Sequence, residues 1–250
     1  MTERRHALVT GGNSGIGRAI ALAIAGEGIN VTICGRREDR LAEVAAESDR
    51  IFAVPADVTD EKSVAALYEK AESARGPFDI VVANAGIASS APAYRTSLEE
   101  WNRIIDVNLT GAFLTVRPAL KGMAERKRGR IIFVASIAGL QGAAYVAPYV
   151  ASKHGVVGLM RALAAELLAT GVTVNAICPA YVETEMLEQS IERVMEKTGR
   201  SKEEARRGFE QTNPNHRLIK PEEVAAAAKW LISDAAISVT GQPIAISGGA

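Results

Sequence analysis

The sequence has 250 residues, of which 48% are hydrophobic, with 29 basic and 29 acidic side chains and a formal net charge of zero. This composition is typical of a globular protein with one sizeable core, and the charge balance excludes a global positive field that would gather nucleic acid or anionic membrane. Two cysteines inside apolar runs exclude a disulfide framework, and no apolar run reaches membrane-spanning length, so we expect a single cytoplasmic domain over residues 1–250.

Short, nearly continuous apolar runs recur along the chain, as is typical of strands that are buried on both faces. They cover residues 6–10, 30–34, 51–54, 79–83, 130–135, 172–178 and 243–246. Helical patterns lie between them: one ends at Gly28, one has Thr59 as its expected N-cap, one begins with a capping box of Ser97 and Glu100, and one begins at Pro221. The alternation predicts an α/β, doubly wound Rossmann fold, a seven-stranded parallel sheet with helices on both faces.

A glycine-rich loop, TGGNSGIGR at residues 10–18, follows the first predicted strand and opens a helix. Its glycines are spaced G-x-x-x-G-x-G, which is not the common dinucleotide fingerprint, and Arg18-Ala19 stands where a Walker A motif requires Lys-Ser/Thr. Glycines still allow a tight turn and a close approach to a pyrophosphate, and the helix N-terminus supplies unpaired N–H groups. We therefore predict a dinucleotide site at Gly11, Asn13, Ser14, Gly15, Ile16 and Gly17.

The second predicted strand runs into Gly35-Arg36-Arg37 without an acidic residue. In dinucleotide folds an acid at this position binds the ribose of NAD, whereas an arginine accommodates the 2′-phosphate of NADP. The pattern favours NADP, with Arg36 as the principal contact and Arg37 beside it. NAD, or two merely solvated arginines at a helix start, remain the alternatives.

The stretch YVAPYVASKHG, residues 145–155, contains two tyrosines and a lysine at four-residue spacing. Pro148 suits the first turn of a helix and clashes with a helix interior, so the helix is expected to begin there. Tyr149 and Lys153 then share one helix face, whereas Tyr145 lies on the incoming loop. Tyr149 is the candidate acid.

TGGNSGIG, NAG at 84–86, VNLTG at 107–111, Ser136 and Tyr149-x-x-x-Lys153 occur together in order, and with them the chain resembles the short-chain dehydrogenase/reductase family, most of all its 3-oxoacyl-thioester reductases. The resemblance implies a catalytic tetrad of Asn108, Ser136, Tyr149 and Lys153. Tyr149 would exchange its phenolic proton with a carbonyl oxygen, and Lys153 would favour the phenolate and hold the nicotinamide ribose. Ser136 would bind the substrate oxygen and Asn108 a relay water; a strand-end hydroxyl and a helix polar residue are the plainer alternatives.

The resemblance also implies the remaining cofactor contacts, namely Asp57, Val58, Asn84, Ala85, Gly86, Val107, Tyr149, Lys153, Pro179, Val182 and Thr184. The chain departs from the family pattern at Ala83, Ala180 and Ser247. Ser14 stands before Gly15 where many NADP-dependent members have a basic residue. These departures bear on fine cofactor contacts and leave the expected reaction intact.

The predicted substrate contacts are Ser136, Gln141, Tyr145, Tyr149 and Met186, with loop packing as the alternative for Gln141 and Tyr145. Residues 183–217 form a charged helical insertion that we interpret as a substrate lid, since Met186 and its helical neighbours give it one apolar face. We expect Arg206, Arg207 and the run Arg126-Lys127-Arg128 to attract the phosphates of a CoA or carrier-protein arm.

The sequence thus predicts an NADP(H)-preferring oxidoreductase that acts on a ketone or secondary alcohol, with a CoA- or ACP-linked 3-oxoacyl thioester as the leading substrate. A small cyclic ketone, sugar or steroid is the alternative substrate. A non-catalytic, cofactor-sensing regulatory protein is the alternative hypothesis from a different functional class. The three histidines lack metal-ligand spacing, so we expect no metal site. The resemblance implies a homotetramer or homodimer, with the apolar face of residues 104–120 as part of a helix-to-helix subunit interface; packing of this face in the core is the alternative.

Overall fold

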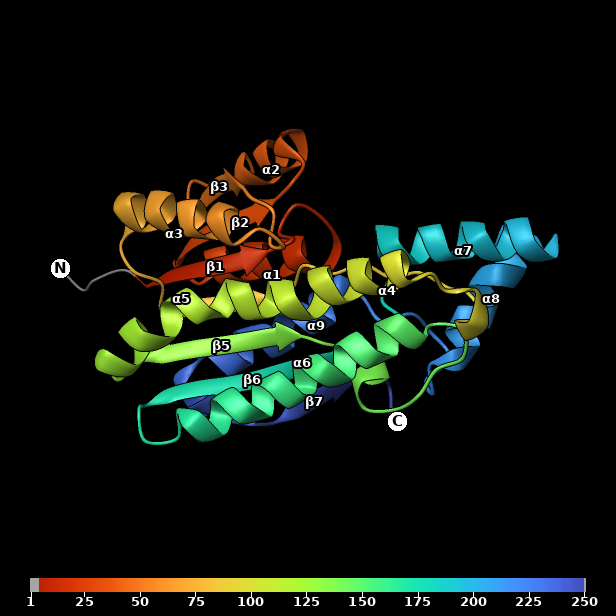
Figure 1. Ribbon diagram of the computed structural model, residues 1–250. Coiled ribbons are helices and arrows are strands. Elements are labelled where there is room, and N and C mark those ends of the chain that lie inside the picture. The colour runs from red at the N-terminus through yellow and green to blue at the C-terminus, as the bar shows by residue number, and fades with distance from the viewer. Residues whose placement is uncertain (1–4, 250) are drawn as a thin grey trace.

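The computed structural model describes residues 5–249, and its centre is one seven-stranded parallel sheet in the order β3-β2-β1-β4-β5-β6-β7 (Figure 1). The strands are β1 His6–Thr10, β2 Asn30–Gly35, β3 Ile51–Pro55, β4 Ile80–Ala83, β5 Gly129–Val134, β6 Val172–Pro179 and β7 Pro243–Ile246. Each lies within one residue of a predicted apolar run, and the doubly wound α/β fold is confirmed. Every residue of β1, β4, β5 and β6 is buried, which explains why these runs are continuous rather than alternating.

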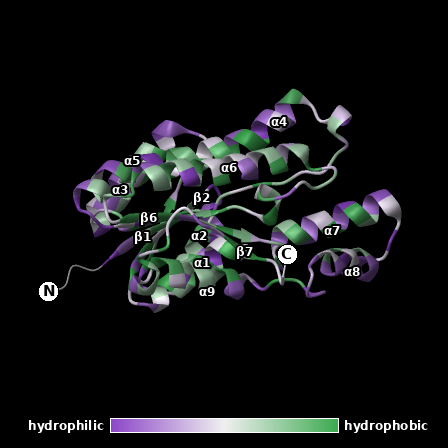
Figure 2. Ribbon diagram, turned by 90° about the horizontal axis from the view of Figure 1, so that it is seen from below, coloured by the Kyte–Doolittle hydropathy of each residue, from purple (hydrophilic) through white to green (hydrophobic). Residues whose placement is uncertain are grey.

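Helices cover both faces of the sheet, with α1, α2 and α9 packed on one core and α3, α5 and α6 on the other; Figure 2 shows α5 and α6 above the strands and α1 and α9 below. Their bounds are α1 Gly15–Gly26, α2 Glu38–Ala45, α3 Glu61–Arg75, α4 Leu98–Ile105, α5 Gly111–Glu125, α6 Ala147–Glu166, α7 Glu185–Thr198, α8 Lys202–Thr212 and α9 Pro221–Ile232. Cys34 and Cys178 are free and buried in these cores. None of the helices in residues 5–249 combines the length and apolar character needed to cross a membrane.

Two predicted helix caps are wrong in detail. The N-cap of α3 is Asp60, whose side chain accepts from the Lys62 N–H at 2.9 Å, because both the hydroxyl and the N–H of Thr59 are taken by the Asp57 carboxylate in the preceding turn. Ser97 caps α4 as expected, but the Glu100 carboxylate binds Arg103 instead of returning to the cap.

The predicted insertion, residues 183–217, leaves the sheet after β6 and contains α7 and α8; we call it the arm. Figure 1 shows both helices beyond the carboxyl end of β5, away from the chain's N-terminus. The arm has a small core of its own, formed by Leu187, Ile191, Ala205 and Leu218. The residues on either side of the arm, Val182 and Ile219, are joined by a parallel bridge.

Candidate active site

A cleft of about 1570 Å³ opens at the carboxyl edge of the sheet, where the chain reverses its winding between β1 and β4. Parallel α/β sheets bind ligands at this reversal, because the loops diverge there and leave a crevice. All of the predicted cofactor residues line the cleft: Gly11, Asn13, Ser14, Gly15, Ile16, Gly17, Arg36, Arg37, Asp57, Val58, Asn84, Ala85, Gly86, Val107, Tyr149, Lys153, Pro179, Val182 and Thr184.

The glycine loop is built for close backbone approach. Gly11 and Gly15 have φ of +64° and +51°, and a Cβ on Gly17 would lie 2.2 Å from the Gly11 carbonyl oxygen. Ser14 is the N-cap of α1 but makes no side-chain cap bond, so the first-turn N–H groups are left to bind a ligand. Asn84 fixes the floor by donating to the Thr10 carbonyl at 2.8 Å. The loop therefore fits a pyrophosphate.

The two arginines after β2 differ in their side-chain partners. Arg37 pairs with Glu185 at 3.4 Å, and with the Asn13 amide turned so that its oxygen faces the guanidinium, Arg37 also donates to it at 3.0 and 3.2 Å. Arg36 is exposed at the cleft and has no ion pair or hydrogen bond within residues 5–249, although its charge helps to lower the pKa of Asp57 after the larger effect of the Thr59 N–H. Arg36 is the arginine that is free to receive an added anion.

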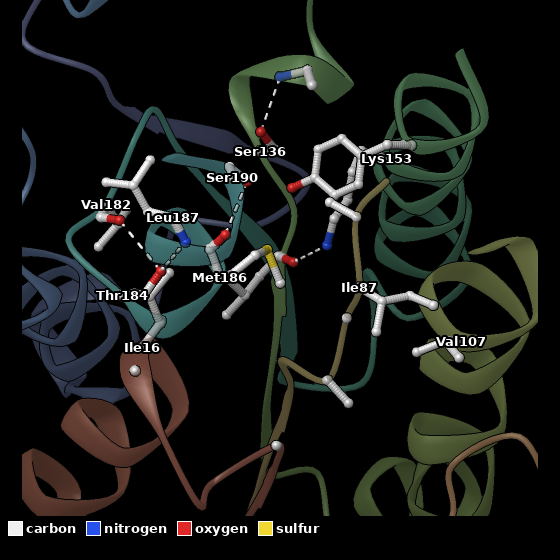
Figure 3. Close-up of a pocket in the computed structure, with 18 of the residues that line it drawn as sticks. Ile16, Ile87, Val107, Ser136, Lys153, Val182, Thr184, Met186, Leu187 and Ser190 are labelled. Atoms are coloured by element: carbon white, nitrogen blue, oxygen red, sulfur yellow. Dashed lines mark hydrogen bonds between the residues drawn. The ribbon is translucent and has the colours of Figure 1, made fainter. Parts of the chain in front are cut away.

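Tyr149 and Lys153 lie one turn apart near the start of α6, which begins at Ala147 with Pro148 in its first turn. The Lys153 Nζ lies 5.7 Å from the centre of the Tyr149 ring and donates to the Val134 carbonyl at 2.8 Å. Figure 3 shows Lys153, Ser136 and Met186 around the same cavity. The helix start predicted from Pro148 is thus confirmed, and it brings the phenol and the ammonium to one wall of the cleft.

The titration of this pair differs from the expected lowering of the tyrosine pKa. Burial raises the pKa of Tyr149, only partly offset by a hydrogen bond with Ser136, and burial lowers the pKa of Lys153 to about 8. Both groups lose water, and desolvation disfavours the charged form of each. Without ligands Tyr149 is therefore protonated at neutral pH, and the Lys153 ammonium loses its proton at lower pH than an ordinary lysine.

Ser136 lines the cleft, whereas Asn108 is buried behind the cleft wall. The Ser136 hydroxyl lines the cleft, where it accepts from the Ala138 N–H at 3.1 Å and donates to the Pro179 carbonyl at 3.4 Å. Asn108 is 1% exposed, lies in a π-helical turn (Asp106–Thr110) and does not line the cleft. Its side chain exchanges hydrogen bonds with the Ile87 backbone and donates to the Ser152 hydroxyl, so it positions the cleft wall from behind.

Among the predicted substrate residues, Gln141 and Met186 line the cleft and Tyr145 does not. Tyr145 is 65% exposed and has a φ of +65°. Its carbonyl accepts from the Ala91 N–H at 2.8 Å, so the residue serves the loop backbone while its ring faces outward. The structure thus gives no support to the predicted contact between Tyr145 and substrate, and favours the alternative of loop packing.

The expected phosphate-binding arginines are also wrong. Arg206 is surrounded by the carboxylates of Glu183, Glu188 and Glu210. Arg207 does not line the cleft, and the run Arg126–Arg128 precedes β5, at the opposite edge of the sheet. Arg128 is there paired with Asp79. None of these five residues lines the cleft.

Several cleft residues were missed by the sequence reasoning, and helical periodicity was the signal that could have found part of them. Along α7 one continuous face lines the cleft, composed of Met186, Gln189, Ser190, Arg193, Val194 and Lys197. Tyr181 and Phe209 close another side, with ring centres 4.9 Å apart in an edge-to-face arrangement. The arm therefore contributes cations as well as apolar surface.

Comparison with known proteins finds similarity to one family and to several reductases. Residues 5–194 match the family described as short chain dehydrogenase. The chain is 41% identical over 249 residues to a Streptomyces violaceoruber protein named as a ketoacyl reductase of the granaticin polyketide synthase, covering 97% of this chain and 92% of that one. It is 38% identical to an acetoacetyl-CoA reductase of Shinella zoogloeoides, covering 98% of each. A crystal structure of a variant actinorhodin polyketide ketoreductase with NADPH superposes with a TM-score of 0.96 at 38% identity, covering 100% of this chain and 98% of that chain.

Proposed function

The chain belongs to the short-chain dehydrogenase family, and from that premise we propose that it is an NADPH-dependent oxidoreductase that reduces the ketone of a 3-oxoacyl thioester carried on CoA or a carrier protein. One observation carries the proposal: Tyr149, half-buried, shares the cleft with Lys153, Ser136 and a glycine loop shaped for a pyrophosphate. The raised pKa of Tyr149 agrees with a proton donor. The relatives named as ketoacyl and acetoacetyl-CoA reductases support the substrate class.

The residues that would hold NADPH divide along the cleft. The glycine loop and the N-terminus of α1 receive the pyrophosphate, Arg36 the 2′-phosphate, and Asp57 and Val58 flank the adenine. Lys153 binds the nicotinamide ribose, and the remaining lining residues enclose the nicotinamide end: Asn84, Ala85, Gly86, Val107, Pro179, Val182 and Thr184. When bound, NADPH supplies the hydride.

The chain's own groups manage the proton and the orientation. Ser136 donates a hydrogen bond to the substrate carbonyl oxygen. Tyr149 gives its phenolic proton to the same oxygen as the ketone is reduced to an alcohol. The raised pKa of Tyr149 keeps that proton in place before reaction, which suits reduction. The Lys153 cation stabilises the phenolate that remains. Asn108 fixes the Ile87 segment of the cleft wall through its side chain.

We further propose that residues 1–250 act as one domain with the arm, residues 183–217, as its substrate lid. The arm's face toward the cleft includes Met186, and Gln141, which follows Ser136 on the segment before α6, also lines the cleft. Tyr181 and Phe209 offer an aromatic wall for the acyl end of the substrate.

The test follows the absorbance of the reduced cofactor with acetoacetyl thioesters, cyclic ketones, sugars and steroids. A clear advantage in kcat/KM for the thioesters is expected. Turnover of cyclic ketones or another free carbonyl alone would favour the alternative substrate class. Tight NADPH binding without turnover of any of them would instead indicate a cofactor-sensing regulatory protein.

We also propose a homotetramer or homodimer in the cytoplasm. Support comes from exposed apolar side chains on α4 and α5, with Trp101 and Phe113 each 38% exposed, and from two cysteines that are both free. Light scattering after gel filtration, with Phe113→Asp as the disrupting variant, measures the state of assembly.

A further inference from the structure

The outer end of the cleft carries two cations on α7. Arg193 and Lys197 continue the face that starts with Met186, seven and eleven residues further along the helix. At 1.5 Å per residue they lie about 10 and about 16 Å from Met186 along the helix axis. The segment Ala88–Ser90 faces them across the mouth, since both cations donate to its carbonyls.

Neither cation is neutralised within residues 5–249. Arg193 donates to the Gln189 carbonyl at 3.1 Å, the Ala88 carbonyl at 3.5 Å and the Ser190 hydroxyl at 3.4 Å, and Lys197 donates to the Ser90 carbonyl at 3.1 Å. All of these acceptors are uncharged. Elsewhere on the arm Arg206 has three carboxylate partners and Lys202 has one. Arg200 and Arg207 have no ion pair within residues 5–249 either, but of these four unpaired cations Arg193 and Lys197 are the ones that line the cleft.

Glu100, whose pKa the charge of Arg193 helps to lower, does not cancel them. Glu100 contributes both carboxylate oxygens to Arg103 at 2.7 Å, and its pKa is lowered to about 2, first by that bond and then by a hydrogen bond from Ser89, with the charge of Arg193 contributing last. Its charge is thus already matched by Arg103, which also lines the cleft. The cations Arg193 and Lys197 line the cleft with one further acid of this region, the exposed Asp106, so positive charge is still in excess there.

We propose that Arg193 and Lys197 bind the phosphate at the far end of the pantetheine arm of the substrate, an inference that rests on the thioester function proposed above. An extended pantetheine places its phosphate about 13 bonds from the thioester sulfur, or ~15 Å with backbone-like bond geometry. That length is comparable with the about 10 and about 16 Å along α7 from Met186 to the two cations. Figure 3 shows Met186 at the same cavity as Ser136 and Lys153. CoA and a carrier protein share this phosphate, so either source would be recognised.

A latch is the competing role for the same contacts. Bonds from Arg193 and Lys197 to the Ala88 and Ser90 carbonyls could serve only to hold α7 against the opposite wall. A latch would affect every substrate equally, whereas a phosphate site affects only phosphorylated ones. The two roles are therefore separable with substrates that differ by the phosphate alone.

The experiment compares acetoacetyl-phosphopantetheine with acetoacetyl-pantetheine in the full-length enzyme with NADPH. The unmodified enzyme should prefer the phosphorylated form by about tenfold or more in kcat/KM, as a charge-assisted contact provides. The double variant Arg193→Ala/Lys197→Ala should lose this preference while its kcat/KM for acetoacetyl-pantetheine stays within about twofold. Arg207→Ala, on the same arm but outside the cleft, is the matched control and should keep the preference.

Acetoacetyl-CoA and an acetoacetyl carrier protein then identify the source, since the one used should show the same loss in the double variant. Equal losses on both pantetheine substrates would establish the latch and overturn the inference, as would the absence of a preference in the unmodified enzyme. If neither thioester is reduced, the proposed function is wrong. Calorimetry of phosphopantetheine and pantetheine binding to the NADPH-loaded enzyme then decides the inference, which requires tighter binding of the phosphorylated form and its loss in the double variant.

Discussion

The two walls of the cleft are held in place by different forces. On the inner wall, Ser136 and Lys153 are less than 10% exposed and are fixed by hydrogen bonds to the backbone of neighbouring strands. On the outer wall, the arm relies on a small core and on half-exposed ion pairs such as those of Arg206. Buried bonds of the first kind resist displacement, whereas exposed pairs contribute typically less than 1 kcal/mol each.

The difference between the two walls assigns catalysis to the inner wall and substrate selection to the outer wall. A catalytic proton donor must be fixed to within a fraction of an ångström, and the sheet edge supplies that rigidity. The arm packs on a small core of its own and contributes none of Ser136, Tyr149 and Lys153. Substitutions on the inner wall should therefore change kcat, and substitutions on the outer wall should change substrate preference or local stability.

Tyr149→Phe tests the inner wall most directly and should have the largest effect. It removes the proton donor and little packing, so kcat should fall by at least ~10²-fold while NADPH binding stays nearly unchanged. Steady-state kinetics and fluorescence titration with NADPH measure the two quantities.

Tyr145→Phe is the control for that change, since Tyr145 is four residues away but does not line the cleft. Its kcat should remain close to that of the unmodified enzyme. A larger loss in Tyr145→Phe than in Tyr149→Phe would reverse the assignment of the acid.

Arg36→Ala tests the cofactor end of the same wall. The loss of a charge-assisted contact costs about 1.5 to 3 kcal/mol, so the Kd for NADPH should rise by about tenfold or more and that for NADH should barely change. Arg37→Ala should be milder, because Arg37 is already engaged by Glu185 and Asn13. Equal affinity of the unmodified protein for both cofactors would contradict the NADP assignment.

The pH dependence sharpens the comparison further, because burial lowers the pKa of Lys153 from 10.5 to about 8. As the pH rises through about 8 the folded protein loses this cation, so kcat/KM for reduction should fall by up to about tenfold per pH unit. The unfolded chain keeps the proton up to about 10.4 and binds more protons than the folded protein in this window, so the lysine's contribution to the free energy of unfolding should rise with pH.

Lys153→Met is the reference for both effects. Its residual activity should lack the step near pH 8, and its stability should lack the corresponding rise between about pH 8 and 10. A step that persists in Lys153→Met would assign the titration to another group.

Ser201→Ala should give the smallest effect, confined to the outer wall. Ser201 and Glu204 form a capping box at the start of α8, and loss of such a cap costs about 1 kcal/mol. Hydrogen exchange should quicken in α8 while kcat with a small free ketone stays unchanged. A fall in kcat comparable to that of Tyr149→Phe would show that the two walls are not independent.

The sequence could predict whatever depends on local pattern or on the chemistry of one residue type. The strands followed from continuous apolar runs, the start of α6 from Pro148, and the positions of Ser136, Tyr149 and Lys153 in one cleft from the family motifs. The roles of charged residues were harder to predict, because the ability of an arginine to bind a ligand depends on its neighbours in space. Arg206 is neutralised by Glu183 and Glu188, and the run at Arg126 lies at the other edge of the sheet.

The strand order has a consequence for how the protein reaches its native state. Ala7 of β1 pairs with Ile80 of β4, with β2 and β3 placed outside this pair although they lie between them in sequence. Closing such a long loop is entropically slow, whereas the pairs β1–β2 and β2–β3 join nearer segments. The cleft lies at the carboxyl end of the late pair, so the first strands and helices can assemble on a nascent or refolding chain without it. Recovered enzyme activity should then lag behind recovered helix content, and a chain cut between β3 and β4 should regain activity only when its two pieces meet.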